Sequence, residues 1–325
     1  MATIKDLAKE ADLAVGTVSR VLNNRGYISK GTRDKVYSAM KRIGYSPNAF
    51  AQGLSKKKMD CIAVIVPHIV HPYFAKMISR LEKEASKRGY KVIIFNSSGD
   101  AAKESDELLR YQSSFISGVL LFSADISAEA LMNFRIPLVL VEREPAGNAV
   151  SIQCDNVAGG RLAANHLIKK GCRNLIVISS LNTADMPGDD RENEFVRVCS
   201  ESGATVKRYS AGSEQYISLD YHDLICRALN ENPDCDGIFA TSDLIAAQVI
   251  QECGRKGLRI PEDIKLVGFD DVELAGLTTP TITTVHQPIR EIAEAAIETI
   301  EKLNEEKKVP RKIVLPVTLI ERDSA

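Results

Sequence analysis

Residues 3–24 read TIKDLAKEADLAVGTVSRVLNN, and they indicate two short helices joined by a tight turn. Thr3 and Asp6 have the spacing of a capping box, in which each side chain satisfies the other residue's backbone N–H. Apolar residues then recur at helical spacing in two groups: Ile4, Leu7, Ala8 and Ala11, then Val15, Val18, Val21 and Leu22. The break at Asp12-Leu13 is so short that the two helices must cross sharply. This arrangement predicts a helix-turn-helix.

A third helix is expected from about Thr32 to Ile43, ending at Gly44. Ser46 as a cap and Pro47 at the first helical position predict one more helix start. Only residues 48–54 follow before the charged run 55–58, and a helix this short is marginal alone in water. We therefore expect either a linker or a helix that folds only when something holds it.

The charge of the chain is divided unevenly along its length. Residues 1–58 hold eight lysines and four arginines against four carboxylates, a net charge of +8. Because the whole chain carries −1, the remainder carries −9. A basic head on an acidic body suits a polyanion-binding module joined to another domain.

Composition excludes several other classes of protein. With 325 residues, 44% of them hydrophobic, the chain has the composition of an ordinary globular protein large enough for several domains. No apolar run approaches the roughly 20 residues that span a bilayer, and the N-terminus has no signal-peptide core. We therefore expect a cytoplasmic protein. Its seven cysteines include no CxxC pair, so we expect reduced thiols, no metal site and no cofactor.

From Cys61 onward, short apolar runs alternate with helical stretches. The expected strands are 61–66, 91–95, 118–122 and 137–141, followed by 174–179, 205–209, 237–241, 265–269 and 281–285. The expected helices are 72–88, 104–115, 127–134, 156–170, 191–202, 214–230, 244–256 and 289–303. Nearly continuous apolar strands separated by helices indicate parallel sheets covered on both faces. About nine strands in two series predict an α/β body of two doubly wound lobes, whose ligands bind at the carboxyl ends of the strands.

Together these features resemble the LacI/GalR family of bacterial transcription regulators over essentially the whole chain. The resemblance is carried by the opening stretch, by GYSPNAFAQGL at 44–54, by VGFDD at 267–271 and by TTPTITTVHQP at 278–288. It implies a helix-turn-helix domain at 1–46, a hinge helix and linker at 47–58, and a periplasmic-binding-protein-like effector and dimerisation domain at 59–325. The lobes of that body would comprise about 61–153 with 289–314, and about 156–285 with 316–325. No leucine heptad follows the run at 313–320, so a homodimer on a pseudo-palindromic operator is expected.

The second helix of such a head presents its N-terminal residues to base edges in the major groove. By position these are Val15 and Gly16, with Arg20 one turn further on; Arg20 can donate two hydrogen bonds to guanine, worth about 1–3 kcal/mol of discrimination. Thr17, Ser19 and Asn23 are expected to hold phosphates. In the family a hinge leucine, here Leu54, wedges into the central base step. Two positions depart from the family pattern: Asp12 stands where glycine is usual, and Ala14 where a serine cap is usual.

The resemblance also implies effector contacts, and they follow strands as the sheet argument requires. They are Tyr73, Phe74, Ser123, Glu142, Arg191, Tyr216, Asp270 and Gln287. A sugar needs flat apolar faces, which Phe74 and Tyr216 offer, and fixed polar groups for its hydroxyls. The family usually has aspartate in place of Glu142 and glycine in place of Glu194. No phosphate cradle is visible, which favours an unphosphorylated sugar.

The sequence therefore predicts a repressor whose operator affinity is changed by a small-molecule effector, with a sugar expected. One alternative is a corepressed regulator that answers to a purine or to a partner protein. A sugar-binding receptor without a DNA role would lack the basic head and carry an export signal. No GxSxG, GxGxxG or P-loop is present, so an enzyme is not expected. Whether the effector weakens or strengthens operator binding is left open.

Overall fold

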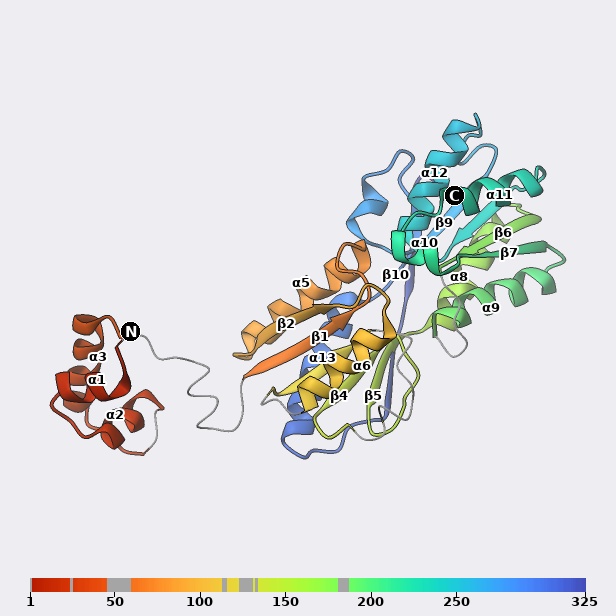
Figure 1. Cartoon of the computed structure of the whole chain (residues 1–325). Helices are drawn as coiled ribbons and strands as arrows, with labels where there is room; N and C mark the ends of the chain where they lie inside the picture. The colour runs from red at the N-terminus through yellow and green to blue at the C-terminus, as the bar shows by residue number, and fades with distance from the viewer. Residues whose placement is uncertain are drawn as a thin grey trace. The chain divides into compact units, whose positions relative to one another are not determined.

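The computed structural model describes residues 2–23, 26–45, 60–112, 116–122, 131, 134–180 and 187–325. The chain divides into two compact units, Met1–Met59 and Asp60–Ala325. Figure 1 shows their helices and strands.

The first unit is a bundle of three short helices: α1 (Ile4–Glu10), α2 (Val15–Leu22) and α3 (Lys30–Ile43). The predicted capping box is confirmed, because Asp6 accepts from the Thr3 backbone at 2.9 Å while the Thr3 hydroxyl accepts from the Asp6 backbone at 3.3 Å. Asp12 has a left-handed φ of 53° in the turn, which Asp tolerates better than most residues. Ala14 caps α2 without a side-chain hydrogen bond, and Gly44 ends α3 with a φ of 63°.

The core of this unit contains the apolar stripes that the sequence indicates. Its buried members are Leu7, Ala8, Ala11, Val18, Val21, Val36 and Ala39. An ion pair of 2.7 Å between Arg42 Nε and Glu10 Oε1 connects the last turn of α3 with the end of α1. The packing of α1 and α3 leaves the N-terminal turn of α2 exposed.

The second unit contains two six-stranded sheets. The first has the order β11-β5-β4-β3-β1-β2, with all neighbours parallel. Its strands are β1 (Cys61–Val66), β2 (Lys91–Asn96), β3 (Gly118–Leu121), β4 (Leu138–Val141), β5 (Val150–Cys154) and β11 (Lys312–Leu315). We call this sheet, with α5 (Pro72–Lys87), α6 (Ala101–Gln112) and α13 (Ile289–Asn304), the first lobe.

The second sheet has the order β12-β10-β9-β8-β6-β7. Its strands are β6 (Asn174–Ser179), β7 (Thr205–Ser210), β8 (Gly237–Ala240), β9 (Lys265–Asp270), β10 (Thr283–His286) and the antiparallel β12 (Thr318–Ile320). Its helices are α8 (Asn156–Lys169), α9 (Pro187–Glu201), α10 (Ser213–Ser218), α11 (His222–Glu231), α12 (Asp243–Arg255) and the 3₁₀ turn η1 (Glu273–Gly276). This second lobe joins the first by three crossings, β5 to α8, β10 to α13 and β11 to β12 (Figure 1).

The expected α/β architecture is confirmed, but several elements differ from the expectation. The described residues form twelve strands, because β5 was not expected and the run at 313–320 splits into β11 and β12. All of β5 is buried, including its polar residues, and the Ser151 hydroxyl donates to the Arg143 carbonyl at 2.5 Å. The helix expected at 214–230 is two helices, separated at Leu219 with a φ of 58°. The expected helix at 127–134 lies almost entirely outside the described residues.

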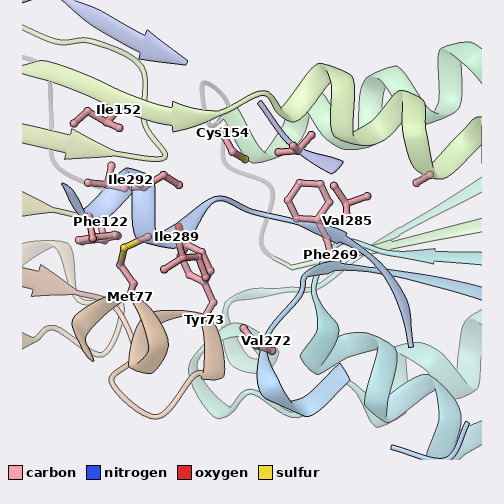
Figure 2. Packing of buried hydrophobic residues seen from close by; sticks show 14 of the residues in the cluster. Tyr73, Met77, Phe122, Ile152, Cys154, Phe269, Val272, Val285, Ile289 and Ile292 are labelled. Atoms are coloured by element: carbon pink, nitrogen blue, oxygen red, sulfur yellow. The ribbon is translucent and has the colours of Figure 1, made fainter. Parts of the chain in front are cut away.

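One hydrophobic cluster runs through both lobes. It includes Tyr73 and Met77 on α5, Phe269 and Val285 in the second sheet, and Ile289 at the start of α13. Figure 2 shows Tyr73 beside Ile289, with Val272 of the second lobe below them. The first turn of α5 therefore belongs to a core to which both lobes contribute. No helix in the described part of the chain is long and apolar enough to cross a membrane.

Candidate functional site

A charged network connects the two lobes at the carboxyl ends of their strands. Glu142 directly follows β4 of the first sheet, and its carboxylate accepts from the Cys154 backbone at 2.6 Å and from Asn156 Nδ2 at 2.9 Å. Asn156, the first residue of α8, accepts in turn from Arg191 Nε at 2.8 Å. Arg191 lies on α9 of the second lobe, and its Nη2 is 3.8 Å from Glu142 Oε2. The polar links therefore run from one sheet to the other.

Packing as well as charge fixes the Arg191 guanidinium. Its Nη1 donates to the Thr241 carbonyl, just after β8, at 3.0 Å. Its central carbon lies 3.6 Å from the ring centroid of Phe269, a cation–π contact. Helix α8 approaches α9 so closely that a Cβ on Gly160 would lie 2.1 Å from the Arg191 carbonyl oxygen. Glycine at this position permits the close approach.

Two buried acids lie at the carboxyl ends of strands in the second sheet: Asp270 ends β9, and Asp243 follows β8. Asp270, with a φ of 112°, accepts from Gln287 Nε2 at 2.7 Å. Asp243, the first residue of α12, accepts from the Thr284 hydroxyl at 2.6 Å and from the Val272 backbone at 2.9 Å. Burial raises the pKa of Asp243 to about 7. Burial, with the neighbouring Asp243, also raises the pKa of Asp270 well above its usual value.

Aromatic rings of the first lobe adjoin this network. Tyr73 and Phe74 open α5 with ring centroids 5.2 Å apart, and Phe74 lies 6.1 Å edge-on from Phe122 after β3. Burial raises the pKa of Tyr73, and the charges of Glu142, Asp270 and Arg191 also act on its hydroxyl. Its phenol is therefore placed among the polar side chains that both lobes contribute.

Tyr216 makes a separate contact between the lobes. It lies on α10 of the second lobe, with its ring 4.7 Å from that of His68, which follows β1 of the first. A Cβ on Gly99, after β2, would lie 3.4 Å from the same tyrosine ring. Burial lowers the pKa of His68, so this imidazole is neutral at physiological pH.

Five of the eight candidate effector residues form one group: Tyr73, Glu142, Arg191, Asp270 and Gln287. Phe74 joins them through Tyr73, whereas Tyr216 packs on His68. Ser123 lies outside the described residues. The sequence did not point to three of their partners, namely Asn156, Asp243 and Phe269. Asn156 was missed because it follows β5, in which Ser151 and Gln153 interrupt the continuous apolar run that marks most of the other strands.

The DNA-facing candidates lie on or directly after α2. Val15 is 42% exposed, Gly16 and Arg20 are also exposed, and Thr17 and Ser19 are half-buried. Asn23 Nδ2 donates to the Ser19 carbonyl at 2.8 Å, so this amide lies back on its own helix. Leu54 lies outside the described residues. Within the described ranges, no group of three or more His, Cys, Asp or Glu side chains could hold a metal ion.

Comparison with known proteins decides the family. Residues 3–48 match bacterial regulatory proteins of the lacI family, and residues 164–325 match the periplasmic binding protein-like domain. A ribose operon repressor of Halalkalibacterium halodurans is 32% identical over 330 residues, covering 100% of this chain and 97% of the relative. The chain belongs to the LacI family. LacI-family members are DNA-binding transcription regulators, so this chain is a regulator and not an enzyme.

Two further LacI-family relatives cover most or all of the chain. A sucrose operon repressor of Streptococcus mutans is 31% identical over 324 residues, covering 100% of this chain and 99% of the relative. A crystal structure of a periplasmic binding protein/LacI transcriptional regulator from Alkaliphilus metalliredigens, complexed with D-xylulofuranose, has a TM-score of 0.72 and 28% identity. It covers 82% of this chain and 98% of that chain.

Proposed function

We propose that this regulator is a cytoplasmic homodimeric repressor whose affinity for operator DNA is changed by a sugar bound between its lobes. The observation that carries the proposal is the Glu142–Asn156–Arg191 network, which connects the carboxyl ends of strands in both sheets. A ligand held by groups from both lobes binds more tightly to one arrangement of the lobes than to another. Because its affinity for these arrangements differs, the ligand shifts the equilibrium between them.

The sugar would be held by polar groups from both lobes and by an aromatic face. Glu142, Arg191, Asp270 and Gln287 offer fixed donors and acceptors for hydroxyls, and the half-buried Phe74 offers a flat face for C–H surfaces. Ribose and sucrose operon repressors among the relatives, and the xylulofuranose complex, support this ligand class.

The operator would be read by the exposed turn of α2. Arg20 is the one base-reading candidate with hydrogen-bond donors, whereas Val15 and Gly16 offer shape and a thymine-methyl contact. Thr17 and Ser19 would hold phosphates, and Asn23 would do so after leaving the Ser19 carbonyl. Leu54 would supply the wedge at the central base step.

The proposal is tested on the full-length protein. Sugars, sugar phosphates and purines are first screened by thermal shift, because a ligand at 100 times its Kd stabilises a protein by about 2.7 kcal/mol. The operator, selected from a library of pseudo-palindromic duplexes, is then titrated with and without the sugar that binds. We expect a sugar to change operator affinity. A response to purines alone would overturn the sugar assignment.

Arg191→Lys probes the site, and Arg197→Lys on the same helix is its matched control, because the half-exposed Arg197 pairs with Glu194 and Glu201 of its own helix. Lysine cannot reproduce the fork that joins Asn156 and the Thr241 carbonyl. Arg191→Lys should weaken sugar binding at least about tenfold, whereas Arg197→Lys should leave it unchanged. Equal sugar affinities in the two variants would show that Arg191 does not contribute to sugar binding.

A further inference from the structure

The two opposite charges that face each other in the interlobe site, Arg191 and Glu142, already make hydrogen bonds to protein groups. Arg191 donates to Asn156 and to the Thr241 carbonyl, and its Nη2 is 3.8 Å from Glu142. The two carboxylate oxygens of Glu142 accept from the Cys154 backbone and from Asn156. The guanidinium of the network is thus faced by Glu142, with Asp270 also acting on it.

The site also leaves neutral polar atoms without a partner. Among the described residues, the Tyr73 hydroxyl and Gln287 Oε1 in the site, and His68 Nε2 beside Tyr216, are buried without a hydrogen-bond partner in the protein. Their residues are only 6%, 1% and 5% exposed. A buried polar atom without a partner is unfavourable, so these positions are suited to meet a ligand. Gln287 uses its Nε2 on Asp270, and its remaining oxygen requires a donor such as a hydroxyl.

We propose that this site accepts only uncharged polyols, and that the Glu142 carboxylate beside Arg191 excludes phosphorylated and carboxylated sugars. This inference rests on the proposed function, since it specifies the sugar that the same site binds. An anion approaching the free N–H groups of Arg191 would lie beside Glu142 Oε2. Like charges brought together away from water repel strongly, and the Glu142–Asn156–Arg191 network offers this anion no second cation.

An ammonium ligand fits no better than an anion. The charge of Glu142 is already faced by Arg191, so an amine would need Asp270 ionised. Burial raises the pKa of that carboxyl, which favours its neutral form. Hydroxyl groups, by contrast, can donate to Gln287 Oε1 and exchange hydrogen bonds with Tyr73 at no electrostatic cost.

The test compares neutral sugars with their charged analogues. The panel contains ribose, xylulose, glucose and sucrose, each with its phosphate, together with glucuronate and glucosamine, and binding is measured by thermal shift and titration calorimetry on the full-length protein. We expect the neutral member of the set that binds to be favoured by about 100-fold or more over its charged analogues. A phosphate, uronate or amino sugar that binds as well as its neutral parent overturns this inference but leaves the sugar-responsive regulator intact. If no sugar of any charge binds, both proposals fail.

Two substitutions at one position separate charge from size. Glu142→Gln removes the carboxylate charge, and it should reduce the discrimination against the phosphate at least about tenfold. Glu142→Asp keeps the charge while shortening the side chain, and it should retain the discrimination. Equal discrimination in both variants would contradict an electrostatic role for Glu142. The comparison of ligands on the unaltered protein still decides the proposal if Glu142→Gln does not fold.

Discussion

Asp243 is buried at the start of α12, where its two oxygens accept from Thr284 and from the Val272 backbone. These bonds lower its pKa, but the loss of solvation is larger and raises it to about 7 from 3.8. Between pH 3.8 and about pH 7, the folded protein binds a proton at this carboxyl that the unfolded chain does not bind. Its contribution to stability is therefore complete below about pH 3.8 and is lost as the pH rises through about 7.

Asp243→Asn tests this directly, because an amide can donate to Thr284 and accept from Val272 as a protonated carboxyl does. The free energy of unfolding of the unaltered protein, minus that of the variant, should increase as the pH falls from 8 to 5. One proton limits the slope to about 1.4 kcal/mol per pH unit. The measurement is urea unfolding at a series of pH values.

The difference in free energy of unfolding between the unaltered protein and Asp243→Asn is the quantity to follow, because buried histidines change the stability with pH in the opposite direction. Burial lowers the pKa of His71 to about 4, so this imidazole costs stability as the pH falls below its usual value. Both proteins share that effect, and it cancels. Because the Asp243 charge also raises the pKa of Asp270, the difference reports protons bound by both carboxyls. A difference that stays constant from pH 8 to 5 would show that this pair binds no additional proton when Asp243 is present.

At the scale of elements, the contact between α8 and α9 holds Arg191 in place. A Cβ on Gly160 would overlap the Arg191 carbonyl at 2.1 Å, and one on Gly159 would lie 2.6 Å from the Phe269 ring. A Cβ on Gly254, in α12, would meet no atom within 4 Å beyond its own helix backbone and chain neighbours. Alanine would therefore clash at Gly160 in α8 but not at Gly254 in α12.

Gly160→Ala should lower the free energy of unfolding by about 1–3 kcal/mol, because the methyl group forces α8 away from α9. Gly254→Ala, the matched control, should raise it by about 0.4–1 kcal/mol, because alanine favours a helix and meets no atom there. Urea unfolding of both variants measures the two values. A stabilising Gly160→Ala would contradict the close approach of the two helices.

Periodicity predicted most elements, because buried parallel strands such as β1 and β6 are continuous apolar runs bounded by helices. It missed β5 because Ser151 and Gln153 satisfy their polar groups inside the sheet, which the sequence does not reveal. It also merged α10 with α11, since the left-handed Leu219 is not a residue typical of a helix break.

For the site, the sequence indicated the residues that follow strands but not their partners. Glu142 and Arg191 are both expected from the sequence, whereas Asn156, which connects them, lies beyond the unexpected β5. The buried Asp243 was missed because its partners, Val272 and Thr284, are 29 and 41 residues away. Contacts at such separations depend on the folded sheet and cannot be read from local spacing.

At the scale of the whole molecule, function requires that the sugar site and the operator-binding head affect each other. Both lobes share one hydrophobic cluster and three crossings, so a ligand that changes their packing acts on the whole effector unit. Coupling between two binding sites is reciprocal: if the sugar weakens operator binding, the operator must weaken sugar binding by the same factor.

The most direct measurement is the affinity of the sugar for the full-length protein, alone and saturated with operator duplex, by titration calorimetry. We predict affinities that differ by about 5–150-fold, the usual range of such coupling. The ratio should equal the ratio of operator affinities measured with and without the sugar. Equal sugar affinities in the free and operator-bound protein would contradict regulation by this ligand.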